Sequence, residues 1–108
     1  GLNAFDQLDL MAAEVPAGSD GLIALPHLQG SGPPDLNANA RACFFGMTIA
    51  HGKEPFVRAI MESVVMVLCR IIEATEALDI SVDRIISFGG GAPRRLCILI
   101  KYCCVNAV

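Results

Sequence analysis

Apolar and polar positions follow a helical rhythm in two parts of the chain and gather into short apolar runs in three others. The first helical part covers residues 3–14, where apolar residues recur every three or four positions. Asn3 is expected to cap this helix, and Asp6 lies in its first turn, where the helix dipole favours an anion. The breaker Pro16-Ala17-Gly18 should end it.

The three short apolar runs are predicted as β-strands at residues 21–26, 42–49 and 84–88. The first two are expected to pair antiparallel, with Gly46 as a bulge or a point of close approach. Residues 29–40 lie between them and are rich in Gly, Pro, Asp and Asn, so they are predicted as a loop.

The second helical part begins at Pro55 and runs to about Leu78. Its charges fall within roughly 120° of the helix circumference, and the rest is apolar. The charged residues of this stripe are Arg58, Glu62, Arg70, Glu73 and Glu76. A helix this broadly apolar should be covered on more than one side. Two interpretations stay open: a central core helix, or a helix shared with another domain or subunit.

The predicted order is helix, strand, strand, helix, strand and helix, with a turn at residues 79–83 and the last helix at residues 96–104. This order indicates the α/β class. Three short strands make a narrow sheet, so the chain resembles part of a domain. If the helix at residues 56–78 is shared, the isolated chain should self-associate or pair with a missing lobe.

Composition narrows the function classes. Apolar residues make up 54% of the 108 residues and charged residues 18%, and the net charge is −3. The negative charge argues against a nucleic-acid binder, and no apolar run is long enough to span a membrane. No signal peptide is expected. Five cysteines without a C-x-x-C pair favour a reduced, cytoplasmic protein, and His27 and His51 are isolated, which favours loop or core roles over a metal site.

A glycine cluster near the end of the chain is the strongest chemical signal. The predicted strand at residues 84–88 stops at Gly89, Gly90 and Gly91, and Pro93 then suits the first turn of a helix. Free backbone N–H groups at such a turn suit a phosphate or nucleotide, although a tight connection without ligand is equally compatible. The spacing fits neither the G-x-G-x-x-G fingerprint nor a Walker loop.

Four stretches in order carry a resemblance that covers nearly the whole chain: residues 20–28, 37–48, 56–62 and 88–92. Together they resemble the carboxy-terminal lobe of the FGGY family of carbohydrate kinases, which includes xylulokinase and glycerol kinase. Residues 30–34 read Gly-Ser-Gly-Pro-Pro where xylulokinase-like members usually read Gly-Glu-Arg-Thr-Pro. Pro55 stands where the family signature expects a polar residue, and the last dozen residues also depart from the family pattern.

The resemblance implies a ribonuclease-H-like, actin-like fold, with residues 1–108 forming an incomplete part of the nucleotide-binding carboxy-terminal domain of a two-domain sugar kinase. ATP and Mg²⁺ are the implied cofactors. Backbone of Gly89, Gly90, Gly91 and Ala92 would contact the nucleotide, and Arg95 would flank the adenine, although a solvated helix start is an equal interpretation for the arginine.

The resemblance places the phosphate loop, the catalytic aspartate and most sugar contacts on an amino-terminal lobe, so no catalytic residue is predicted here. The resemblance also implies that the loop from Gly30 to Asp35 faces the cleft between the lobes. A turn-capping role is favoured for Asp35 over a catalytic one. The alternatives are a non-catalytic actin-like nucleotide binder and a structural fragment that binds no nucleotide.

Overall fold

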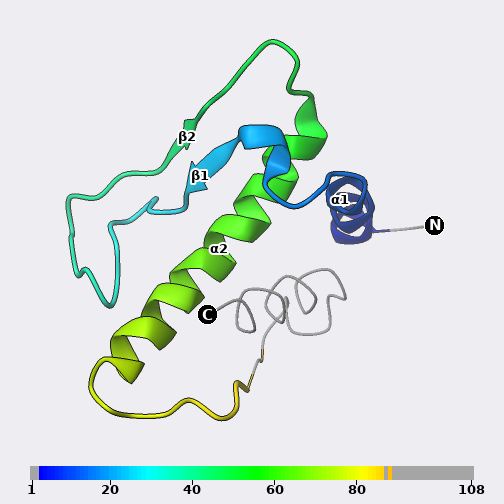
Figure 1. Cartoon of the computed structure of the whole chain (residues 1–108). Helices are drawn as coiled ribbons and strands as arrows, with labels where there is room; N and C mark the ends of the chain where they lie inside the picture. The colour runs from blue at the N-terminus through cyan, green and yellow to red at the C-terminus, as the bar shows by residue number, and fades with distance from the viewer. Residues whose placement is uncertain (1–2, 87, 89–108) are drawn as a thin grey trace.

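The computed structural model describes residues 3–86 and 88, and these form two α-helices, a short 3-10 turn and a two-stranded sheet (Figure 1). In chain order the elements are α1 (Ala4–Ala13), η1 (Ser19–Gly21), β1 (Ile23–Leu25), β2 (Cys43–Phe45) and α2 (Lys53–Glu76). The long α2 is the centre of the arrangement, because α1, η1 and β1 all contact it.

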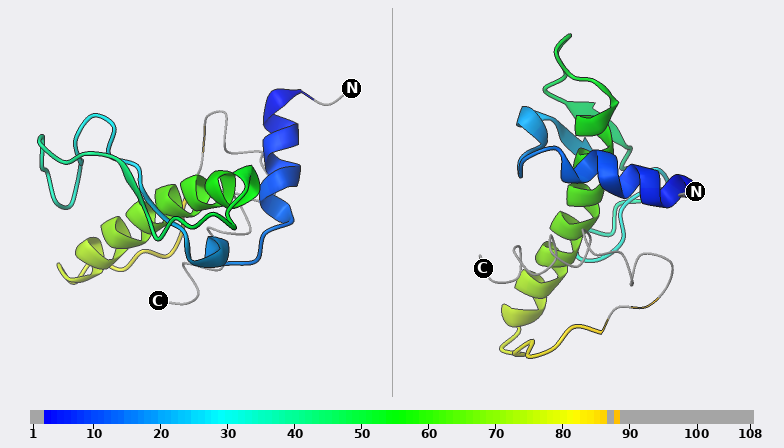
Figure 2. Two further views of the ribbon diagram at one scale, coloured as in Figure 1. Left: turned by 90° about the horizontal axis from the view of Figure 1, so that it is seen from above. Right: turned by 90° about the vertical axis from the view of Figure 1, so that its right-hand side faces the viewer.

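The first helix agrees with its prediction. Asn3 caps α1, and its side-chain Oδ1 accepts a hydrogen bond of 2.9 Å from the backbone N–H of Asp6. At the other end, the N–H of Glu14 donates to the carbonyls of Ala12 and Met11. The helix lies across the amino-terminal half of α2 (Figure 2), and Ala12 is fully buried. A small residue at this position allows the two elements to approach closely.

The sheet pairs β1 with β2 antiparallel, as predicted, although each strand has only three residues. The register sets Ala24 opposite Phe44, and this pair faces α2. Ala24 joins a buried cluster with Leu22 and Ala59, and Phe56 packs against it. Phe44 meets Phe56 edge to face, with ring centroids 4.9 Å apart. Edge-to-face contact is a favoured geometry for aromatic pairs.

Gly46 follows β2 and is a point of close approach, the second of the two alternatives that the sequence left open. Its φ is +83°, which is a left-handed conformation that side chains disfavour. A Cβ atom at this position would lie 2.7 Å from the carbonyl oxygen of Gly21. Because backbone cannot move aside as a side chain can, only glycine fits between the two segments.

The helix α2 begins at Lys53, two residues before the predicted start, and Pro55 lies in its first turn. Two sets of positions are buried. Pro55, Ala59 and Ser63 form the first set, and Val65, Cys69 and Ile72 form the second. At 100° per residue the two sets lie on different faces, so the prediction that α2 is covered on more than one side is confirmed.

The predicted third strand is wrong for the residues that the structure describes, because residues 84–86 and 88 have no strand conformation. Ile86 and Phe88 are 72% and 91% exposed, and no described segment lies beside them to complete a ladder of hydrogen bonds. The turn after α2 lies at residues 77–79, earlier than predicted, and Asp79 has a φ of +61°. The predicted helix at residues 96–104 lies outside the described residues.

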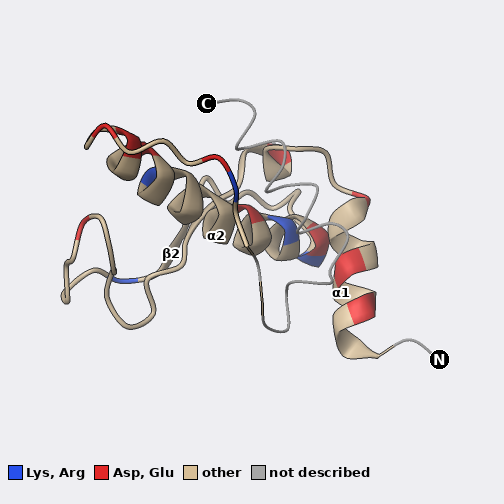
Figure 3. Cartoon of the chain, turned by 90° about the horizontal axis from the view of Figure 1, so that it is seen from below, with Lys and Arg blue, Asp and Glu red and all other residues tan. Residues whose placement is uncertain are grey.

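Charge is distributed unequally between the helices. Figure 3 shows acidic residues alone on α1, whereas acidic and basic residues follow one another along α2.

Among the described residues, no helix is both long and apolar enough to cross a membrane.

Candidate functional site

The residues predicted to bind nucleotide lie outside the described residues: Gly89, Gly90, Gly91, Ala92 and Arg95. Their role therefore stays a prediction. The described part of the chain offers a second region of interest, the loop at residues 30–37. It contains residues 30–35, which the family resemblance led us to expect at a cleft between lobes.

This loop is closed at its neck by hydrogen bonds between its two ends. The N–H of Ser31 donates to the carbonyl of Asn37 at 2.8 Å, and the N–H of Asn37 donates to Ser31 Oγ at 3.1 Å. Gly30 is needed at the neck because its φ is +82° and a Cβ would lie 3.0 Å from the backbone of Ala38. The Pro33–Pro34 peptide bond is cis. Apart from a bridge at Leu28 and Gly30, residues 29–40 form no strand or helix, which confirms the predicted loop.

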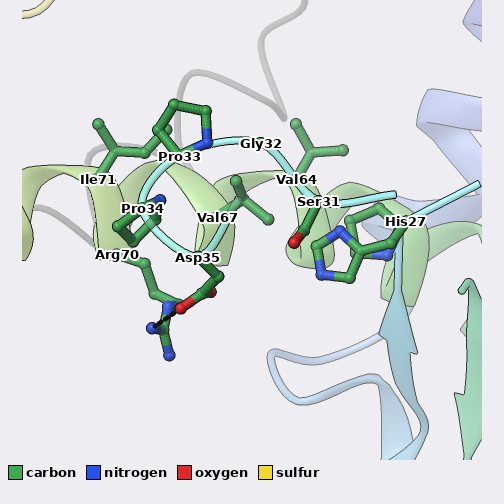
Figure 4. A pocket seen from close by; sticks show the side chains of 11 residues that line it. His27, Ser31, Gly32, Pro33, Pro34, Asp35, Val64, Val67, Arg70 and Ile71 are labelled. Carbon is green, nitrogen blue, oxygen red and sulfur yellow. Dashed lines mark hydrogen bonds and ion pairs between the residues drawn. The ribbon is translucent and has the colours of Figure 1, made fainter. Parts of the chain in front are cut away.

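A pocket of about 320 Å³ lies between this loop and the side of α2 that carries Val64, Val67 and Ile71, which we call the outer side (Figure 4). One wall is the proline-containing loop, and the other is a row of aliphatic side chains from the helix. The residues that line it are Pro26, His27, Ser31, Gly32, Pro33, Pro34, Asp35, Val64, Val67, Arg70 and Ile71. The lining is mainly apolar, with four side chains that can form hydrogen bonds.

Asp35 and Arg70 join the loop to α2 at one side of the pocket. Arg70 Nη2 donates to Asp35 Oδ1 at 2.9 Å. The side chain of Arg70 is 60% exposed and that of Asp35 is 54% exposed. An ion pair this exposed is screened by water and salt and contributes little to stability. Among the described residues, Arg70 is the donor to this carboxylate and no backbone N–H of the turn reaches it, so the favoured turn-capping role of Asp35 is not what the structure shows.

A second polar centre lies at the turn before β1, which has an unusual backbone. Gly18, Ser19, Asp20 and Gly21 all have positive φ, between 52° and 96°. Such conformations are disfavoured for Ser and Asp and persist only where surrounding contacts hold them. Sequence patterns did not predict this turn beyond the glycine breaker.

Glu62 of α2 provides one of those contacts. Its carboxylate accepts from the N–H of Gly18 at 3.1 Å and from the hydroxyl of Ser19 at 3.0 Å. Arg58 donates to the same carboxylate at 2.7 Å, and both charged side chains are largely buried. The sequence correctly placed Arg58 and Glu62 on one charged stripe, and at these two positions the stripe contacts the turn, whereas Arg70, Glu73 and Glu76 of the same stripe are exposed. Only their separation by four positions signalled a pair.

His51 provides the other contact. Its Nδ1 accepts the N–H of Thr48 at 3.0 Å, so Nε2 carries the proton and donates to the carbonyl of Asp20 at 2.9 Å. The predicted loop role of His51 is therefore confirmed. His27 lies in a loop at the pocket wall. In the part of the chain that the structure describes, no three His, Cys, Asp or Glu side chains gather as a metal site would require.

The sequence model for the C-terminal domain of the FGGY family of carbohydrate kinases matches residues 2–101. The chain belongs to this family. The gluconokinase of Bacillus subtilis is 41% identical over 93 residues, which are 85% of this chain and 18% of that protein. The xylulose kinase of the same organism is 36% identical over 89 residues, or 82% of this chain and 18% of that enzyme.

Solved structures agree with the family assignment. The xylulose kinase from Rhodospirillum rubrum superposes with a TM-score of 0.82 at 32% identity, covering 91% of this chain and 19% of that one. The glycerol kinase of Plasmodium falciparum, solved with ADP, shares the fold with a TM-score of 0.73 at 21% identity, over 89% of this chain and 19% of its own. This FGGY chain is an incomplete α/β piece of the actin-like fold, as predicted. It spans about a fifth of the length of the relatives it matches.

Proposed function

We propose that this chain supplies the nucleotide side of an ATP-dependent carbohydrate kinase, which transfers the terminal phosphoryl group of ATP to a hydroxyl of a sugar or polyol. The observation that carries the proposal is the family match over residues 2–101, which includes both the described part and the glycine cluster. Gluconokinase and xylulose kinase among the relatives support a sugar or sugar acid as substrate class.

In this proposal, residues 1–108 are part of the carboxy-terminal domain of a two-domain cytoplasmic enzyme. Main-chain amides of Gly89, Gly90, Gly91 and Ala92 contact the nucleotide, and Arg95 flanks the adenine. Glycines suit this task because a missing Cβ lets phosphate and ribose oxygens approach the backbone closely.

Phosphoryl transfer relies on positioning and on neutralising the charge of the phosphates. Mg²⁺ in kinases is usually held by one or two carboxylates together with the phosphates of the nucleotide. The described residues bring no cluster of three such ligands together. We therefore expect the ion to reach the site bound to the phosphates of ATP.

The remaining catalytic parts are assigned to chain that this sequence does not span. No Asp-x-Gly-Thr phosphate loop occurs among the 108 residues. Asp35 is paired with Arg70 at the loop, and we do not assign it the role of the base. We expect sugar to bind mainly through the amino-terminal lobe and the 108-residue chain alone to have no kinase activity.

Isothermal titration calorimetry of the chain with ADP and Mg²⁺ tests the nucleotide claim. We expect measurable heat for the natural sequence and its loss for Gly91→Val, because two methyl groups would occupy the space of the nucleotide. Far-UV circular dichroism of the variant should match that of the natural chain, which separates lost binding from lost folding. Absence of heat in both proteins would refute nucleotide binding by this chain.

A further inference from the structure

The pocket on the outer side of α2 is built from two segments that the structure describes, residues 26–35 and the helix. Its floor is Val64, Val67 and Ile71, and Pro33 and Pro34 form the opposite wall (Figure 4). Hydrogen bonds at the neck of the loop hold this wall in place. The shape of the pocket is therefore present without a ligand, as is usual for small-molecule sites.

The small residues of the loop leave this space open. Residues 30–34 read Gly-Ser-Gly-Pro-Pro, where xylulokinase-like members usually read Gly-Glu-Arg-Thr-Pro. Gly32 lines the pocket without a side chain, and a Cβ atom there would meet no other segment within 4 Å. An arginine at residue 32 would bring a long side chain to the wall of the pocket. The open space thus depends on residues of this particular chain.

The charged groups at the pocket form a pair that is already neutral. Arg70 Nη2 donates to Asp35 Oδ1 at 2.9 Å, so the carboxylate balances the charge of the guanidinium. The pair still offers further N–H donors on the guanidinium and a second carboxylate oxygen as an acceptor. A phosphate or carboxylate ligand would have to approach the negative charge of Asp35 to reach Arg70. An uncharged ligand with both a donor and an acceptor suits the pair better.

The apolar floor disfavours a sugar or polyol. Hydroxyl groups set against Val64, Val67 and Ile71 would lose their hydrogen bonds to water without gaining new ones, which is unfavourable. A flat apolar ring can instead lie between the aliphatic floor and the proline wall. The volume of about 320 Å³ is near the lower end for small-molecule sites, so a ligand with a single ring fits it best.

We propose that this pocket binds a small uncharged aromatic molecule that carries a carboxamide group. The ring lies between Val67 and the two prolines, and the amide donates to Asp35 and accepts from Arg70. A primary carboxamide has both a donor and an acceptor, so it bonds to both members of the ion pair without separating them. The inference does not depend on the proposed function, because it uses only the lining of the pocket.

Benzamide and benzoate are matched probes, because they share the ring and differ in the charge of the substituent. The test titrates each probe into the isotope-labelled 108-residue chain and follows the backbone amides by two-dimensional NMR. We expect benzamide to shift the amides of Ser31, Gly32 and residues 64–71, with a dissociation constant on the order of 1 mM. Benzoate should bind about fivefold more weakly or worse, because its charge would lie close to that of Asp35.

Three variants separate the ion pair from the rest of the pocket. Asp35→Asn keeps the shape of the side chain but leaves Arg70 without its counter-charge, so benzoate should then bind at least as tightly as benzamide. Asp83→Asn removes an exposed carboxylate outside the pocket, and it should keep the preference of the natural chain. Val67→Phe places a ring on the floor of the pocket, and the shifts caused by both probes should be lost.

Each step of the proposal has a result that would overturn it. Absence of benzamide shifts at these amides would show that the pocket binds no such ligand. Equal affinity for the two probes, or a preference for benzamide that survives in Asp35→Asn, would show that the ion pair does not select the ligand. Unchanged binding by Val67→Phe would place the probe elsewhere on the chain. If Val67→Phe loses its helical circular dichroism, the Asp35→Asn comparison still decides, because an exposed ion pair contributes little to folding.

Discussion

The helix α2 has an inner side, which faces β1, and an outer side, which carries Val64 and Ile71 at the pocket. Both sides are rich in apolar residues, yet their surroundings differ. On the inner side Leu22, Ala24 and Ala59 pack in a buried cluster, and Glu62 holds the turn before β1 with hydrogen bonds. On the outer side Val64 and Ile71 remain open, and an exposed ion pair joins the loop to the helix. Apolar composition alone therefore does not show where the stability of this chain resides.

The largest difference is expected between two leucines. Leu22 is 2% exposed in the inner cluster and Leu28 is 87% exposed beside the loop. Leu22→Ala should lower the free energy of unfolding by about 2–5 kcal/mol, because it leaves a cavity. Leu28→Ala should change it by less than about 0.5 kcal/mol. Urea unfolding followed by circular dichroism measures both, and similar losses would contradict the assignment of the core to the inner side.

A smaller difference is expected between two glutamates of α2. Glu62→Gln keeps the shape but removes the charge that receives hydrogen bonds from Gly18, Ser19 and Arg58. It should lower the free energy of unfolding by about 1–3 kcal/mol. Glu73 is exposed, so Glu73→Gln is the matched control and should have almost no effect. Amide exchange at Gly18 should become faster only in the first variant; unchanged exchange would show that other contacts hold the turn.

The smallest effect is expected at the ion pair of the outer side. Asp35→Asn should cost less than about 1 kcal/mol, since both partners are more than half exposed. The loss should shrink further at high salt, because added ions screen exposed charges. Thermal unfolding at two salt concentrations measures this. A salt-independent loss as large as that of Glu62→Gln would mean that the loop is held as firmly as the turn.

Sequence patterns predicted the local features of the fold correctly. Asn3 as a helix cap, the loop and the long helix all follow from preferences that act within a few residues. Gly46 was predicted as a bulge or a point of close approach, because glycine inside a strand pattern usually marks one of the two, and the structure shows the close approach.

Features that depend on distant contacts were not predictable in the same way. Gly18 and Glu62 are 44 positions apart, and no periodicity indicates that they meet. The third strand was predicted from apolar residues alone, but a strand also needs a neighbour to share its hydrogen bonds. The candidate nucleotide residues came from a motif and a family resemblance, and they lie outside the described residues, so the structure adds nothing to that prediction.

The hydrogen bonds of His51 have a consequence for the chemistry of any enzyme that contains this chain. An imidazole can relay a proton from a substrate hydroxyl only if one of its nitrogens is open to that hydroxyl. Here the N–H of Thr48 donates to one ring nitrogen, and the other nitrogen donates to the carbonyl of Asp20. The ring therefore links the turn before β1 to the segment after β2. In the kinase proposed above, we accordingly expect this histidine to hold the backbone and another group to act as the base.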